Sequence, residues 1–182
     1  VGTSRQAAGG GWCSMRISLI GHGGSGKDTA AVWFDGHTSL RFNGMTTSVV
    51  ILNEMVKREK EGGRHVDRRT LFEARRENRE EWKSVGDDLM REDPLAIIRK
   101  IIGACDVVVG IRSLRELEQS KSLVDLHIWI DRDVPPDPTV SVLAGECDLV
   151  IPNYSGLSEF YGSLERLSRA LNIYTGATCL AT

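Results

Sequence analysis

The 182-residue sequence predicts an α/β fold of three layers, in which helices cover both faces of a parallel sheet of about five strands. Short apolar runs alternate with longer segments of helical spacing, and this order favours parallel strands joined by right-handed crossovers. The runs are almost wholly apolar, as expected of strands covered on both faces. Because ligands of such sheets bind at the carboxyl ends of the strands, the residues that follow each run are the candidates for function.

The elements are predicted from apolar runs and from helical periodicity. The strands are expected at 17–20, 39–42, 106–110, 125–130 and 147–151. The helices are expected at 28–34, 45–60, 68–91, 95–102, 114–120 and 153–172. The third helix is predicted as one long polar segment from the spacing of Leu71, Ala74, Trp82, Val85 and Leu89. Residues 131–146 hold three of the five prolines and are predicted to form a loop.

The composition predicts one soluble domain without a bulk charge for nucleic acid. Apolar residues make up 41% and charged residues 26% of the chain, and the net charge is −2. The four cysteines have no paired spacing, which favours the cytoplasm. Because no apolar run approaches the ~20 residues of a membrane span, we expect no membrane partner. The domain is predicted at 15–173, after a disordered extension at 1–14 and before a loose tail at 174–182.

The most specific motif joins the first predicted strand to the first helix. The segment GHGGSGKDT has the spacing Gly21-x4-Gly26-Lys27 of a Walker A loop, in which backbone N–H groups surround phosphate oxygens. The start of the following helix favours the same negative charge, and Lys27 is predicted to reach the β- and γ-phosphates. The predicted ATP contacts are Gly21, His22, Gly23, Gly24, Ser25, Gly26, Lys27, Asp28 and Thr29. A chance glycine-rich turn is disfavoured because strand, loop and helix agree.

One departure from the Walker A pattern defines a resemblance. The hydroxyl residue that usually follows the lysine is replaced by Asp28, and Thr29 comes one position later. In this GK-x-T form the chain resembles P-loop nucleoside monophosphate kinases, and GSGKDT resembles the bacteriophage-type deoxynucleoside monophosphate kinases in particular. The resemblance implies ATP and Mg²⁺, with Thr29 near the phosphates and among the residues expected at the metal. Asp28 then holds Mg²⁺ through water, or else only favours the start of the helix.

The segment after the third predicted strand carries a second candidate, Arg112. The resembling kinases place an Asp-x-Arg element here, and this chain has Gly110-Ile111-Arg112 followed by Glu116. Arg112 is therefore expected to stabilise the transferred phosphoryl group, although a solvated residue at a helix start is the alternative. Because glycine replaces the acid, Asp131 at the end of the adjacent strand is the expected substitute for binding Mg²⁺.

The acceptor is expected on the middle of the chain. On a helix, Arg75, Arg79 and Trp82 share one face, where guanidinium groups and an aromatic ring can hold a phosphate and a base. The many nearby glutamates make a merely solvated face equally compatible with the pattern. In the resembling kinases this region forms the acceptor-binding arm, and the loop at 131–146 corresponds to the lid. Arg132 is expected to act for that lid, or to pair with Asp131 or Asp133.

Asn153 resembles the asparagine that follows the last strand of these kinases. It is expected to cap the terminal helix, or else to line the adenine site.

The resemblance extends from Met15 to Asn172 and implies an ATP-dependent phosphotransferase acting on a deoxynucleotide, in the host cytoplasm if the protein is viral. Two alternatives stay open at this point. One is a kinase that phosphorylates 5-hydroxymethyluracil in phage DNA during thymidine hypermodification, which needs the base turned out of the stack. The other is a non-catalytic ATP-binding regulatory module. The oligomeric state is not predicted.

Overall fold

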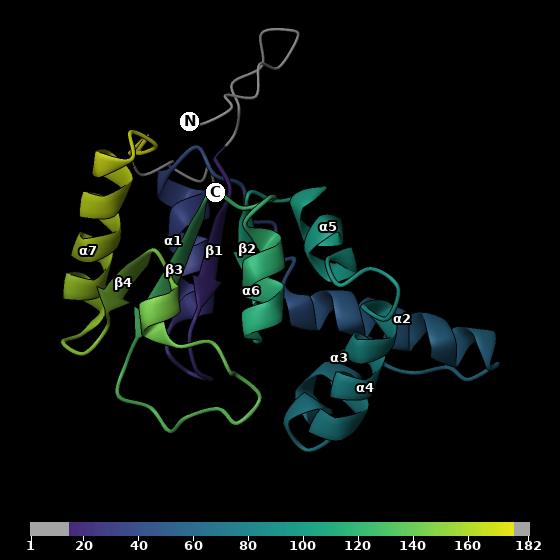
Figure 1. Cartoon of the computed structure of the whole chain (residues 1–182). Coiled ribbons are helices and arrows are strands. Elements are labelled where there is room, and N and C mark those ends of the chain that lie inside the picture. The colour runs from purple at the N-terminus through teal and green to yellow at the C-terminus, as the bar shows by residue number, and fades with distance from the viewer. Residues whose placement is uncertain (1–14, 177–182) are drawn as a thin grey trace, which may run out of the picture.

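The computed structural model describes residues 15–176 and has a parallel sheet at its centre (Figure 1). In the described part the sheet has four strands, β1 (Ile17–Ile20), β2 (Val107–Val109), β3 (Leu126–Asp131) and β4 (Leu149–Pro152), in the order β2-β1-β3-β4. All three strand pairs are parallel, and Ile17 lies opposite both Val107 and Leu126. The α/β class and the parallel sheet are thus confirmed.

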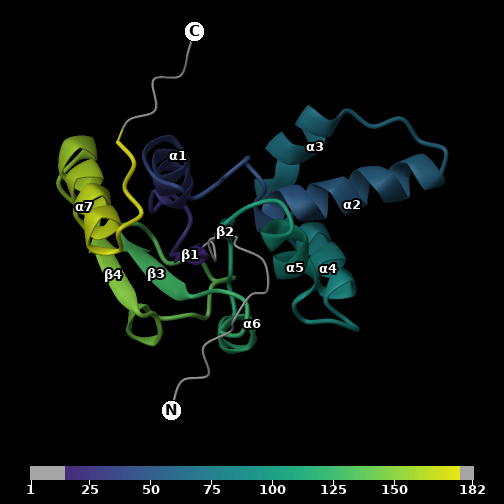
Figure 2. The same ribbon diagram turned by 90° about the horizontal axis from the view of Figure 1, so that it is seen from above.

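Helices cover both faces of the sheet, which gives the three layers (Figure 2). Alternate side chains of β1 point to opposite faces, so that Ile17 and Leu19 pack in one apolar cluster and Ile20 in another. The first cluster lies under α1 (Lys27–His37) and α7 (Leu157–Ala170). The second lies under α5 (Ala96–Ile102) and α6 (Leu114–Ser120). The helix expected at 114–120 is confirmed.

The helices between α1 and α5 form an arm beside the sheet (Figure 1). The arm consists of α2 (Thr47–Glu61), α3 (Arg68–Glu73), the 3-10 helix η1 (Ala74–Arg76) and α4 (Arg79–Leu89). It has a small apolar core of its own, formed by Leu52, Met55, Trp82 and Val85.

The single long helix expected at 68–91 is wrong, because the chain leaves helical geometry at Asn78 (φ −103°, ψ 37°). In one straight helix Phe72 and Trp82 would lie about 15 Å apart along the axis. The break brings their rings to 6.1 Å, so that both pack against α2.

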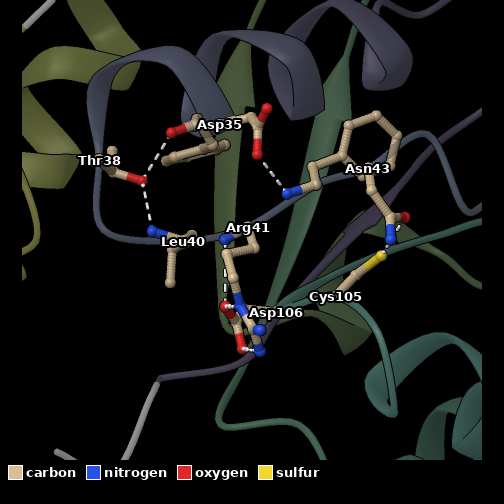
Figure 3. Close-up of polar contacts among 9 residues, drawn as sticks. Asp35, Thr38, Leu40, Arg41, Asn43, Cys105 and Asp106 are labelled. Carbon is tan, nitrogen blue, oxygen red and sulfur yellow. Dashed lines mark hydrogen bonds and ion pairs between the residues drawn. The ribbon is translucent and has the colours of Figure 1, made fainter. Parts of the chain in front are cut away.

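The strand expected at 39–42 is also wrong, and side-chain hydrogen bonds explain why (Figure 3). The segment lies beside the start of β2, where the Asp106 N–H donates to the Arg41 carbonyl at 2.8 Å. The next amides of the segment, however, bind side chains: Leu40 N–H donates to Thr38 Oγ1 at 3.1 Å, and Arg41 N–H donates to Asp106 Oδ2 at 3.1 Å. Because these oxygens replace a neighbouring strand, the described sheet has four strands instead of about five.

The end of the chain differs in two respects from expectation. Asn153 does not cap the last helix, which begins at Leu157 after Gly156. Two residues of the predicted tail are hydrogen-bonded to the body: Tyr174 forms an isolated bridge with Thr38, and the Thr175 N–H donates to the His37 carbonyl at 3.0 Å. The predicted extension at 1–14 and the rest of the tail at 177–182 lie outside the described residues. Within residues 15–176, no helix has the length and apolar character needed to cross a bilayer.

Candidate active site

A cleft of about 450 Å³ lies at the carboxyl edge of the sheet, between the glycine-rich loop and the arm. Residues from four separate segments line most of it: the glycine-rich loop, the arm, the turn between β2 and α6, and the segment that follows β3; Ile97 of α5 adds to them. We call this last segment, residues 132–143, the strap. The cleft carries five cationic side chains, Lys27, Arg75, Arg79, Lys83 and Arg112. It also carries four carboxylates, Asp28, Asp87, Glu116 and Asp137.

The glycine-rich loop is pressed between the end of β3 and the segment after β4. A Cβ atom on Gly21 (φ +145°) would lie 2.6 Å from the Ile130 carbonyl oxygen. A Cβ atom on Gly26 (φ +103°) would lie 2.5 Å from Asn153 Nδ2, which also donates a 2.8 Å hydrogen bond to the Ser25 carbonyl. Only glycine fits both the backbone angles and the space at these two positions.

Lys27 is the first residue of α1 and points back across the loop. Its Nζ donates hydrogen bonds to the carbonyls of Gly21 at 2.8 Å and His22 at 2.6 Å. Burial lowers the pKa of the Lys27 ammonium, and the charge of Arg112 lowers it further, whereas Asp28 and Asp137 raise it. The Lys27 ammonium and the amino end of α1 together place positive charge at the centre of the loop.

The predicted loop residues divide into two groups. Gly23, Gly24, Lys27 and Asp28 line the cleft. The others, Gly21, His22, Ser25, Gly26 and Thr29, are not among the lining residues, and Thr29 is exposed, so the structure does not bring it to the cleft.

Gly110 explains the missing acid at the end of β2. Its φ of +113° lies in the region that favours glycine, and a Cβ atom here would lie 2.6 Å from Thr47 Oγ1. The Thr47 hydroxyl, at the start of α2, donates to the Val109 carbonyl at 3.0 Å. A carboxylate at position 110 would therefore clash with the arm.

Arg112 lies two residues further on and lines the cleft, as expected of a candidate at a strand end. Its guanidinium donates to Thr139 Oγ1 of the strap at 2.6 Å, and its backbone N–H donates to Glu116 Oε2 at 2.9 Å. Glu116 forms a capping box with Ser113 at the start of α6. The capping box thus fixes the backbone from which Arg112 projects.

The arm brings together the three residues expected to bind an acceptor, Arg75, Arg79 and Trp82, although not on one continuous helix. The Arg75 guanidinium stacks over the Phe72 ring at 4.1 Å. Trp82 is 6% exposed, and its indole Nε1 is buried without a hydrogen-bond partner in the described part of the chain. Apolar side chains of Ile51, Met90 and Ile97 also line the cleft.

Asp137 of the strap is a cleft residue that sequence reasoning missed. Its carboxylate accepts hydrogen bonds from Arg79 at 3.3 Å and from the Thr139 hydroxyl at 2.6 Å. Burial opposes its ionisation, but the hydrogen bonds from Thr139 and the charges of Arg112 and Arg79 outweigh this and lower the pKa of Asp137. Its position in a proline-rich loop gave no signal of a contact with the arm 58 residues earlier.

Two further predicted residues lie outside the lining of the cleft. Asp131 ends β3, and its carboxylate accepts hydrogen bonds from the Tyr154 hydroxyl and, at 3.4 Å, from Trp129 Nε1. Arg132 is exposed and donates to the Gly24 carbonyl at 3.5 Å, so it reaches the glycine-rich loop. Within the described residues, Arg132 forms no ion pair with Asp131, because its guanidinium points towards the loop.

A smaller pocket of about 280 Å³ lies beside the glycine-rich loop, at the start of α7. It is lined by Pro152, Asn153, Tyr154, Ser155, Glu159, Phe160, Ser163 and Arg166. Asn153 connects this pocket to the loop through its hydrogen bond to Ser25.

The fold and the cleft define an α/β protein with a parallel sheet, a glycine-rich loop and a cation-lined cleft at the carboxyl edge. No protein-family model matches this chain, and no curated protein matches it significantly.

Proposed function

We propose that this protein is a P-loop kinase that transfers the γ-phosphate of ATP to a deoxynucleotide. The observation that carries the proposal is the position of Lys27 and Arg112 in one cleft with the arginines of the arm. Phosphoryl transfer depends mainly on in-line positioning and on positive charge around the transferred group. A cleft that joins a Walker A loop to a second cationic wall supplies both requirements.

The triphosphate of ATP binds in the glycine-rich loop. Backbone N–H groups and the amino end of α1 bind the phosphate oxygens, and Lys27 neutralises the charge that develops on the transferred group. The pocket beside Asn153 is the place for the adenine, because it adjoins the loop and combines an aromatic ring with polar side chains.

The acceptor binds on the arm side. The guanidinium groups of Arg79 and Arg112 are suited to a planar two-point contact with a phosphate. Trp82 and the apolar residues Ile51 and Met90 offer a surface for a base. The volume of about 450 Å³ is that of a small-molecule site, which favours a free nucleotide over a polynucleotide.

Mg²⁺ is usually bound by substrate phosphates, water and one or two carboxylates, and it neutralises charge on the phosphates that it bridges. The cleft fits this requirement, because two of its carboxylates, Asp28 and Asp137, lie near enough to Lys27 to raise its pKa. Asp28 or Asp137 would hold the ion, directly or through water. Asp131, which binds Tyr154 instead, lies outside the lining of the cleft.

The proposal is tested by incubating the protein with labelled ATP, Mg²⁺ and each deoxynucleoside monophosphate in turn. We expect a labelled diphosphate from at least one of them. Duplex DNA that contains 5-hydroxymethyluracil, with plain duplex as control, is included in the same screen. Label on the modified duplex alone would replace the free-nucleotide proposal by the DNA kinase. Tight ATP binding without transfer to any acceptor would favour the regulatory module and defeat the proposal.

A further inference from the structure

The strap contacts every wall of the cleft within a few residues of Asp137. The Asp137 N–H donates to His22 Nδ1 of the glycine-rich loop at 3.2 Å, and the Asp137 carboxylate accepts from Arg79 of the arm at 3.3 Å. The Ser141 N–H donates to the Arg112 carbonyl at 2.7 Å. The strap therefore links the loop, the arm and the turn after β2 across the cleft.

The carboxylate of Asp137 lies among the cations that a phosphate needs. Arg79 contacts it directly, Arg112 reaches it through the Thr139 hydroxyl, and Lys27 is close enough for the charge of Asp137 to raise its pKa. The side chain of Asp137 is only 11% exposed, so water screens these interactions weakly. Of the other three cleft carboxylates that the structure describes, Glu116 binds backbone amides, Asp87 pairs with Lys83, and Asp28 is exposed in the first turn of α1.

We infer that Asp137 is an internal competitor for the anion site of the cleft: a phosphate group binds Arg79 and Arg112 only by displacing the Asp137 carboxylate, which releases the strap from the arm. The inference rests on the proposed function for the identity of the anion, and it adds a means of regulation to that site. Negative charge on Asp137 opposes a second anion at the same cations. Arrival of the acceptor phosphate thus takes Arg79 and Arg112 from the strap, and ATP without acceptor meets cations that Asp137 still neutralises.

The first test uses inorganic pyrophosphate as the probe and isothermal titration calorimetry on the full chain without metal. Asp137→Asn removes the competing charge, and we expect it to bind pyrophosphate at least about fivefold more tightly than the unmodified protein. Asp133→Asn is the matched control, because it changes the same charge in the same strap at an exposed residue; its affinity is expected to stay within about twofold. Unchanged or weaker binding by Asp137→Asn overturns the inference, and so does a failure of pyrophosphate to bind at all.

The second test avoids any substitution. Hydrogen exchange of the strap amides is measured in the unmodified protein with and without saturating pyrophosphate. Displacement of Asp137 predicts faster exchange at its amide, which donates to His22, whereas unchanged or slower exchange overturns the inference. Neither readout needs catalysis. An acceptor screen without product would defeat the proposed function, whereas the inference about Asp137 is decided by these two readouts alone.

Discussion

The two walls of the cleft are built in different ways. The wall formed by the glycine-rich loop comes from one continuous segment between β1 and α1, clamped by the Ile130 carbonyl and by Asn153. The opposite wall is assembled from α2, α4, the turn after β2 and the strap, and Arg79 and Asp137 meet there across 58 residues of sequence. The first wall is therefore expected to depend on local backbone geometry, and the second on long-range contacts that one substitution can release.

The largest expected effect tests whether the loop wall carries the transfer. Lys27→Ala removes the cation at the centre of the loop, and we expect kcat for phosphate transfer to fall by about 10²–10³-fold. The fold should persist, because the hydrogen bonds that the side chain forms with described residues lie within the loop. Stopped assays with labelled ATP measure the rate, and thermal unfolding checks the fold. Turnover that survives in a folded variant would contradict the site.

A second substitution tests how tightly the arm is pressed against the sheet. Gly110→Asp restores the acid that the resembling kinases carry, but its Cβ would overlap Thr47 Oγ1 at a φ of +113°. Strain and overpacking together predict a loss of about 2–4 kcal/mol in the free energy of unfolding, measured in urea. Gly36→Ala on α1 is the control, since a Cβ atom there would meet no atom of the described residues within 4 Å and alanine is favoured in a helix. Equal free energies of unfolding for Gly110→Asp and Gly36→Ala would show that Thr47 can move away without cost.

The dependence of ATP affinity on pH tests whether the Lys27 ammonium binds ATP. Because burial lowers its pKa below the ordinary value of 10.5, the ammonium loses its proton at a lower pH than an exposed lysine does. ATP affinity should therefore fall by about tenfold as the pH rises through that lowered pKa. The protein itself should gain stability over the same window, since the unfolded chain binds more protons there.

Calorimetric titrations of ATP between neutral and alkaline pH provide the measurement for this prediction. Lys27→Arg should abolish the decline if it still binds ATP, because arginine keeps its charge over the whole range. Lys83→Arg, at an exposed residue of the arm, should leave the decline unchanged. A decline that persists in Lys27→Arg would have to be assigned to another group.

A smaller effect is expected from the clamp on the loop wall. Asn153→Ala removes the hydrogen bond to the Ser25 carbonyl, and we expect ATP to bind about threefold to tenfold more weakly. Asn53→Ala on α2 is the control, because the hydrogen bond described for this amide comes from Arg68 at the surface of the arm. Equal affinities for ATP in calorimetry would mean that the loop keeps its shape without the clamp.

The smallest effect is expected at Arg132. This exposed guanidinium touches the Gly24 carbonyl at 3.5 Å, a long contact that solvent screens. Arg132→Gln should change kcat/KM by no more than about twofold, whereas Arg112→Gln should lower it by tenfold or more. Comparable losses in the two variants would give Arg132 the role expected of a lid arginine.

The loop wall was predictable because its signal is local. Spacing alone located Gly21, Gly26 and Lys27 between a strand and a helix, and the structure has them there. The arm residues Arg75, Arg79 and Trp82 were also placed on one wall correctly, but for the wrong reason, since the helix breaks at Asn78. The break at Asn78 leaves all three side chains facing the cleft, and the apolar periodicity of the sequence does not reveal it.

The features that sequence reasoning missed all depend on distant partners. Residues 39–42 look like a strand, but side chains of Asp35, Thr38 and Asp106 bind the amides that a sheet would use. Asp137 gave no local signal, because its partners lie on the arm and on the turn after β2. Asn153 had the sequence position of a helix cap, and only the folded chain brings it to the glycine-rich loop.

The side-chain amide of Asn153 also gives the protein a natural spectroscopic label. Its two hydrogens resonate separately in NMR, and the one held by Ser25 senses any shift of the adjoining carbonyl. Any molecule that reshapes the loop, however far from α7, is thereby registered by a single pair of cross-peaks. Ligands can be screened in this way without attaching a dye or changing a residue.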